Sequence, residues 1–446
     1  MIKKLIKIAL LTGAAHVFTI ITLKYLSQHI DSENIGRIGE IDSLFQFIIN
    51  LVALGMQLSA VRYIAINENW KPLYKDAQRA RLTFSLFLVI LSSLFFLKPI
   101  YILFLTAPFF ALSGDYALYG LGKPVTGALL AFFRVFIPAI TIIVLNVLFN
   151  GYVISGYIIS TILIFLFTGL ILAKWIDAPY FYTPSIKSLK LYIQSINLGI
   201  VILNSYIVGL GLIFIAPIFY DQRIIAIAYF GLKVYMIFKG VLRIINQAFI
   251  KEMLSDEICL KVDQIAGLAG LGFAFPLILF PKSFIILFFS DQYQQYYSFI
   301  VVVGISGFIA AIFVSLLTRS TLKHKDALYA KYSTIASLAC LIIEILFSRF
   351  YQNPVSIAIA LLTGELLLTF GLVWINRDID IKSRINFYVK CLLTVLGPIL
   401  TRIYLGDSKY GVIIAVAAFT ISAIFCYWRF GYKTVNQIVN SHSIVS

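Results

Sequence analysis

The stretches VTGALLAFFRVFIPAITIIVLNVLF at residues 125–149 and VISGYIISTILIFLFTGLILA at residues 153–173 decide the fold of this chain. Together they hold a single charged side chain, Arg134. Each is at least as long as the roughly 20 apolar residues that a helix needs to cross a bilayer. Their apolar residues run continuously instead of alternating, so we expect membrane-spanning helices and not the strands of a membrane barrel.

Similar apolar segments recur along the whole chain of 446 residues, 61% of which are hydrophobic and only 13% charged. A soluble protein could not hide so much apolar surface, because its exterior must stay polar. The sequence therefore predicts an all-α polytopic membrane protein with about fourteen transmembrane helices. The expected spans are Leu5–Leu26, Ile41–Ile66, Leu82–Leu97, Ile100–Leu121, Val125–Phe149, Val153–Ala173, Leu191–Phe219, Ile224–Phe249, Val262–Phe280, Phe299–Leu317, Ala327–Phe347, Pro354–Ile375, Phe387–Leu405 and Tyr410–Trp428.

The basic residues test this arrangement, because cytoplasmic loops carry an excess of lysine and arginine. With a cytoplasmic N-terminus, the inner segments hold 23 of the 36 basic residues and the outer loops hold 7. We therefore expect both termini in the cytoplasm. The net charge of +16 then reflects topology, and no nucleic-acid partner is expected.

Several classes of function find no support in the sequence. No Gly-rich phosphate-binding loop of the GxxxxGK[ST] type is present, so ATP hydrolysis is not expected. The four cysteines and four histidines are scattered, which predicts no disulfide framework, no metal site and no cofactor. No outer loop is long enough to fold into a catalytic domain. We therefore expect no catalytic residues and no enzyme.

The eighth expected span, Ile224–Phe249, carries several cations. At 100° per residue, Lys233, Lys239 and Arg243 fall together with Asn246 and Gln247 within an arc of about 140°, and roughly 15 Å separates Lys233 from Arg243. An ionisable group at bilayer depth costs on the order of 2.5–3.5 kcal/mol. This face is therefore expected to line water or bind anions. The alternative is that Lys239 and Arg243 extend to the inner headgroups.

Other spans carry uncharged polar groups that suit a wet cavity. Asn50 and Gln57 fall on one polar face of the second span, and Asn204 lies on the Gly-rich seventh span. Helices of this composition bend more easily and line cavities more often than those packed in lipid. Arg62 lies close to the inner end of the second span, where it can also reach the headgroups.

Further charged residues lie within spans. Arg134 lies on a narrow stripe of small residues, so it either pairs with Asp115 of the preceding span or faces a cavity. Glu344 and Glu365 are isolated carboxyl groups in the eleventh and twelfth spans. Together with Asp115 they are candidates for carrying a coupling ion. A neutral, hydrogen-bonded and inert carboxyl group is the alternative for either glutamate.

Three segments carry a family resemblance: GMQLSAVRYIA at 55–65, GDYALYGLGKP at 114–124 and FFSDQYQQYY at 288–297. In order and spacing they resemble the ends of the second and fourth helices, and the segment joining the ninth and tenth helices, of the multidrug/oligosaccharidyl-lipid/polysaccharide (MOP) flippase superfamily. The resemblance covers nearly the whole chain and is strongest to the polysaccharide branch, the O-antigen and capsule flippases.

The resemblance implies two six-helix lobes around a central cationic cavity, here residues 1–175 and 176–376, with residues 377–446 adding two helices and a cytoplasmic tail. It implies a flippase of the bacterial cytoplasmic (inner) membrane that moves an undecaprenyl-diphosphate-linked oligosaccharide by alternating access. Membrane lipids, a polysaccharide polymerase and a chain-length regulator are the further partners it implies. The cavity would be lined by Lys233, Lys239, Arg243, Arg134, Arg62, Asn50, Gln57 and Asn204.

Two other classes of function remain open. A cation-coupled multidrug exporter of the same fold would favour an acidic cavity, whereas the charges here are mostly basic. An integral-membrane glycosyl or acyl transferase would need paired carboxylates or a His-Asp site near one surface. Only Asp31 and Glu33 outside the first span resemble such a pair, and a solvated turn explains them as well.

Overall fold

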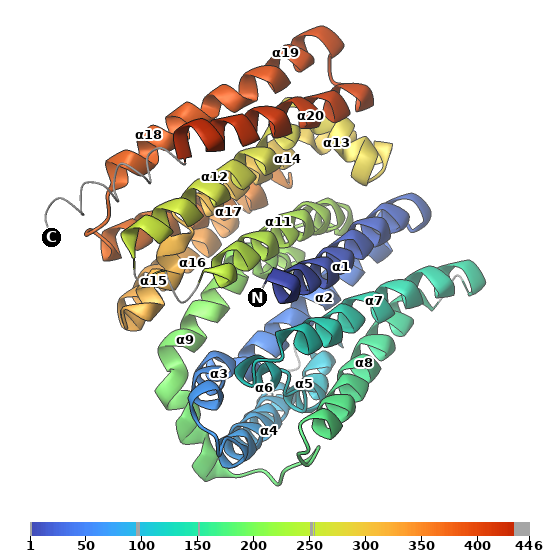
Figure 1. Ribbon diagram of the computed structural model, residues 1–446. Helices are drawn as coiled ribbons and strands as arrows, with labels where there is room; N and C mark the ends of the chain where they lie inside the picture. Colours follow the sequence, from blue (N-terminus) through green and yellow to red (C-terminus); the bar gives the residue numbers. More distant parts are fainter. Residues whose placement is uncertain (1, 95–98, 150–151, 250–252, 254, 432–446) are drawn as a thin grey trace, which may run out of the picture. The chain divides into compact units, whose positions relative to one another are not determined.

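The computed structural model describes residues 2–94, 99–149, 152–249, 253 and 255–431. Every regular element within these residues is a helix (Figure 1). By their contacts the residues form two compact units. The first comprises Met1–Ile207 and Ile213–Ala226, and the second comprises Val208–Leu212 and Ile227–Ser446. The lobe boundaries expected at residues 175 and 376 remain a prediction.

Twelve helices among the described residues are long and apolar enough to cross a membrane, as expected of a multi-pass membrane protein. The all-α membrane fold is thus confirmed, but the count of fourteen spans is not. The expected spans Ile41–Ile66 and Leu82–Leu97 do not qualify. The first is divided between α2 (Ser32–Ala53) and α3 (Met56–Ile66). The second lies up to Leu94 in α4 (Lys71–Leu94), whose first half is charged, and its last residues, 95–97, are outside the described residues.

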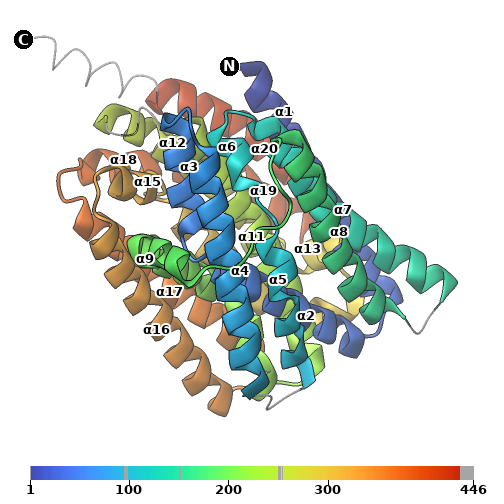
Figure 2. The same ribbon diagram turned by 90° about the horizontal axis from the view of Figure 1, so that it is seen from below.

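The first unit also contains α1 (Ile2–His29), α5 (Ala107–Ala111), α6 (Tyr116–Gly120), α7 (Pro124–Leu148), α8 (Val153–Trp175), α9 (Lys190–Tyr206) and most of α10 (Leu212–Ile215). The helices α7 and α8 form a hairpin and lie side by side in both views (Figures 1 and 2). Figure 2 also shows α4 running beside α5. Helix α9 runs antiparallel to α2, since Tyr206 bonds to Ser43 and Gly199 meets Leu54.

A backbone break divides α2 from α3. Leu54 and Gly55 have φ values of 31° and 76°, in the left-handed region that ends a helix. A Cβ atom on Gly55 would lie 2.4 Å from the backbone nitrogen of Gly199 on α9, so glycine is required for this close approach. The break corrects one expectation: Asn50 and Gln57 do not share one helical face, because they lie on separate helices.

The second unit contains most of α11 (Gln222–Ala248) and all later helices. These are α12 (Asp256–Leu279), α13 (Pro281–Phe288), α14 (Tyr297–Ala311), α15 (Ser315–Leu322), α16 (Asp326–Phe350), α17 (Val355–Ile375), α18 (Ile381–Cys391), α19 (Leu396–Leu405) and α20 (Lys409–Cys426). Helices α16 and α17 form a closely packed hairpin, as Figure 1 shows. The short segment Val208–Leu212 belongs to this unit, and its backbone is not helical at Val208 and Gly209.

Candidate functional site

The three cations of the expected anion-binding face all lie on α11. Lys233 and Lys239 are half-buried, and each ammonium lies over an aromatic ring one turn earlier on the helix. The Nζ atoms are 5.5 Å from the Tyr229 ring centre and 5.4 Å from the Tyr235 ring centre, respectively. Arg243 is exposed. Aromatic faces stabilise cations in a water-poor setting, so part of the predicted cost of burial is offset within α11 itself.

Lys239 forms an ion pair with Glu365 of α17. The Nζ atom lies 2.8 Å from Oε1, and the Tyr235 hydroxyl donates a hydrogen bond to the same oxygen. The Lys239 side chain is 24% exposed, whereas that of Glu365 is 3% exposed. A cation expected to bind substrate and a carboxylate expected to carry a coupling ion are therefore direct partners.

A second carboxyl group lies near this pair. Glu344 of α16 is fully buried, and neither carboxyl oxygen has a hydrogen-bond partner among the described residues. Cys340, one turn earlier on α16, packs against Gly364: a Cβ atom on that glycine would lie 3.3 Å from the Cys340 Cβ. Glu344 and Glu365 thus flank the same contact between α16 and α17. An unpaired charge at such a place is costly, so the Glu344 carboxyl group is suited to holding a proton.

The break in the seventh expected span lies against the same part of α17. A Cβ atom on Gly364 would come within 2.9 Å of the Val208 Cγ1 atom, and one on Gly209 within 3.0 Å of the Met236 sulfur of α11. Val208, Gly364 and Met236 all belong to the second unit. The non-helical backbone is therefore packed directly beside the residue that precedes Glu365.

In the first unit, Arg134 of α7 pairs with Asp115, which precedes α6. The guanidinium Nη1 lies 3.0 Å from the Asp115 carboxylate, and Nε donates to the Thr168 hydroxyl at 3.0 Å. The guanidinium carbon lies 4.6 Å from the centre of the Phe165 ring. Of the two interpretations drawn from the sequence, these contacts favour the structural pairing.

The uncharged candidates occupy α2, α3 and α9. Asn50 and Gln57 are half-buried on either side of the break, and Asn204 is buried on α9. Because Tyr206 meets Ser43 and Gly199 meets Leu54, α9 carries Asn204 along the part of α2 that holds Asn50. Arg62 lies on α3, and its side chain is outside the described part of the structure.

Buried charged side chains in both units were not predicted from the sequence. Arg81 of α4 is almost completely buried and donates to the carbonyl oxygens of Phe110 and Ser113, where α5 ends. In the second unit Asp263 of α12 accepts the Ser315 backbone amide at 2.9 Å, where α15 begins, and pairs with Arg384 at 2.8 Å. In both units a buried charge therefore satisfies backbone groups that a helix break leaves free.

No protein-family model matches the sequence. No curated protein matches it either. Solved structures do match. The lipid II flippase MurJ in an inward closed conformation is similar over 97% of this chain and 100% of that chain, with a TM-score of 0.73 and 15% identity. A MOP superfamily transporter from Pyrococcus furiosus matches over 84% and 95%, with a TM-score of 0.55 and 15% identity. A MATE structure in complex with MaL6 matches over 84% and 96%, with a TM-score of 0.53 and 16% identity. The chain thus has the fold of MOP superfamily transporters.

Proposed function

We propose that this protein is a flippase that moves an undecaprenyl-diphosphate-linked oligosaccharide, an O-antigen or capsule repeat unit, across the bacterial cytoplasmic membrane by alternating access. The observation that carries the proposal is the environment of Lys239. Its ammonium is held by a buried carboxylate on one side, while part of its side chain stays exposed. This leaves donor capacity for an anion, since an ammonium has three N–H groups.

A diphosphate can bind to the whole cationic face of α11 and not to Lys239 alone. Lys233 and Arg243 lie on the same helix, and charge-assisted hydrogen bonds to phosphate offset the desolvation of the anion. The fold likeness does not choose between a lipid-linked sugar and a drug as substrate; the cations of α11 favour the former.

The ion pair suggests how substrate binding is coupled to an ion. When a diphosphate oxygen bonds to Lys239, it competes with Glu365 for the ammonium. A buried carboxylate that loses its counter-charge is stabilised by taking up a proton. The other titratable groups around it are Tyr235 on α11 and Cys340 and Glu344 on α16. Glu365 would then be the group that links substrate binding to a coupling ion.

The break at Val208 and Gly209 gives this exchange a route to a conformational change. Gly364 touches Val208, and Glu365 follows it directly on α17. A shift of Glu365 away from Lys239 would therefore alter the surface against which the break is packed. Bound substrate can favour one conformation only through such a difference in contacts.

Neutral substitutions on α11 test the proposal. We expect Lys233→Gln, Lys239→Gln and Arg243→Gln each to lower surface polysaccharide in a strain that lacks its own flippase. Losing one charge-assisted contact costs about 1.5–3 kcal/mol, so export should fall by roughly one to two orders of magnitude. Lys382→Gln is the matched control, because Lys382 is an exposed lysine of the same unit outside this face. Normal export by all three variants would refute the assignment.

The second candidate function is a cation-coupled multidrug exporter. The buried Glu344 carboxyl group favours it, because a carboxyl group without a protein partner can accept a proton or an organic cation. Drug resistance conferred by the wild type and abolished by Glu344→Gln, with no effect on polysaccharide, would support the exporter. Co-purification with a polysaccharide polymerase or a chain-length regulator would instead support the flippase.

A further inference from the structure

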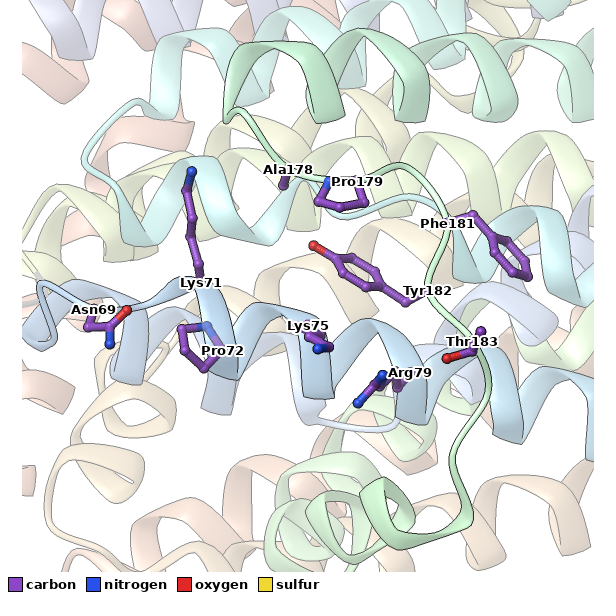
Figure 3. A pocket seen from close by; sticks show the side chains of 10 residues that line it. All are labelled: Asn69, Lys71, Pro72, Lys75, Arg79, Ala178, Pro179, Phe181, Tyr182 and Thr183. Atoms are coloured by element: carbon purple, nitrogen blue, oxygen red, sulfur yellow. The ribbon is translucent and has the colours of Figure 1, made fainter.

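A basic cleft of about 640 Å³ lies in the first unit. One wall is the start of α4, where Lys71, Lys75 and Arg79 follow one another at intervals of four residues. The other wall is the extended segment 178–183, which joins α8 to α9. Figure 3 shows the three cations spaced along the helix while this segment passes across it.

The cations of this cleft form only weak ion pairs with the described residues. Lys71 bonds to the Asp177 carboxylate at 2.9 Å, but that carboxylate is 97% exposed, and exposed pairs contribute little stability. Arg79 lies 4.0 Å from the Asp76 carboxylate, and its Nε is buried without a hydrogen-bond partner among the described residues. Lys75 forms no ion pair with a described residue. The cleft thus offers donors that an anion could bind.

One tyrosine and one acid set the protonation state of this environment. The pKa of Asp177 is lowered by its bond to Lys71, so the carboxylate stays ionised at neutral pH. Burial raises the pKa of Tyr182, which lines the cleft, and the charge of Arg79 opposes that rise. The Tyr182 hydroxyl therefore stays protonated, as a hydrogen-bond donor beside Arg79.

Large apolar side chains are exposed on and near the segment that forms this wall. Phe181, which lines the cleft, is 57% exposed. Ile186, three residues after the segment, is 81% exposed, and Trp175 at the end of α8 also reaches the surface. Cations beside exposed aromatic and aliphatic groups are typical of the membrane–water interface, where the former meet phosphates and the latter meet acyl chains.

We propose that this cleft binds the phosphate headgroup of an anionic membrane lipid, with Lys75 and Arg79 contacting the phosphate and Phe181 lying among the acyl chains. Both walls belong to connections predicted on the inner side of the membrane, whose leaflet attracts basic segments. The site is separate from the proposed transport face on α11 and does not depend on the identity of the transported substrate.

Lipid binding to the purified full-length protein tests this site. Native mass spectrometry would compare phosphatidylglycerol with zwitterionic phosphatidylethanolamine for the wild type and for Lys75→Gln/Arg79→Gln. We expect the wild type to prefer phosphatidylglycerol and the double variant to bind it more weakly, by about fivefold for each charge removed. Lys187→Gln/Lys190→Gln is the matched control, because it removes the same charge from exposed lysines of the same unit outside the cleft.

The outcomes of these binding measurements distinguish a specific lipid site from general attraction of lipid to surface charge. An equal loss of affinity in the control pair would overturn the proposal, as would equal binding of the two lipids by the wild type. Inorganic phosphate is the third probe. If it binds the wild type as tightly as phosphatidylglycerol does, the ligand is free phosphate and the lipid assignment is wrong. Lys75→Arg, which keeps the charge, should bind phosphatidylglycerol as the wild type does.

Discussion

Lys239 on α11 and Glu365 on α17 stand 126 residues apart in the sequence, and the Lys239 ammonium lies 2.8 Å from the Glu365 carboxylate. The Tyr235 hydroxyl completes the coordination of that carboxylate. Desolvation makes such pairs close to neutral for stability, whereas removing one partner leaves the other charge uncompensated. A pair of this kind is well placed to respond to a competing anion.

The topology leads to a labelling prediction. Asp407 accepts the backbone amides of Lys282 and Ser283, so the neighbouring Lys409 is the better position for a cysteine. An impermeant thiol reagent added outside intact cells should label Lys409→Cys and not Asp76→Cys. Background should be low, because the four native cysteines are buried. The opposite pattern of labelling would overturn the orientation with both termini in the cytoplasm.

Replacement of Glu344 separates a proton carrier from an inert core residue. Glu344→Gln should leave the amount of folded protein unchanged, because the carboxyl group has no hydrogen-bond partner among the described residues to lose. If the carboxyl group carries a proton during transport, the variant should export polysaccharide with a flattened dependence on external pH. A pH profile identical to that of the wild type would make Glu344 a structural residue.

The contact between Gly364 and Val208 predicts a defect in transport without a defect in folding. Gly364→Ala should slightly favour helix α17, by roughly 0.5–1 kcal/mol, but its methyl group would press on Val208 at the break. We expect unchanged protein level and reduced export. Gly13→Ala is the control, since a Cβ atom there meets nothing within 4 Å. Normal export by Gly364→Ala would show that the break need not move against α17.

The buried pair of Asp263 and Arg384 is expected to matter for stability. Both side chains are 1% exposed, so Arg384→Ala should destabilise the protein by about 3–5 kcal/mol. Lys382→Ala, an exposed neighbour on α18, should have little effect. The double variant Asp263→Leu/Arg384→Met should recover part of the loss, because no buried charge is left unpaired. Thermal unfolding in detergent would measure all three, and an Arg384→Ala protein as stable as the wild type would contradict the assignment.

Hydropathy alone was enough to predict the helical membrane fold, because lipid requires long apolar segments. It could not predict the break at Leu54 and Gly55, since the close approach of Gly199 on α9 is a tertiary contact. Lys239 and Glu365 were each recognised as charges at membrane depth. The ion pair between them could not be predicted, because nothing in one sequence links two positions on helices so far apart.

The position of Arg81 shows another limit of prediction from sequence. The positive-inside bias places it in a solvated inner connection, among residues that are mostly exposed. In the structure it is buried because the carbonyl oxygens of Phe110 and Ser113, at the end of α5, need donors. That need arises from the break between α5 and α6, which hydropathy does not reveal.

The most direct test of the central claim exchanges the two charges in Lys239→Glu/Glu365→Lys. Each single substitution should reduce both protein level and export, because it places two like charges together. The exchanged pair restores attraction, so protein level and thermal stability should return toward the wild type. Export measured as surface polysaccharide should remain at the level of the single variants, because the accessible charge is now negative and repels the diphosphate. Export restored to the wild-type level in the exchanged variant would show that the pair is purely structural and would contradict the proposal.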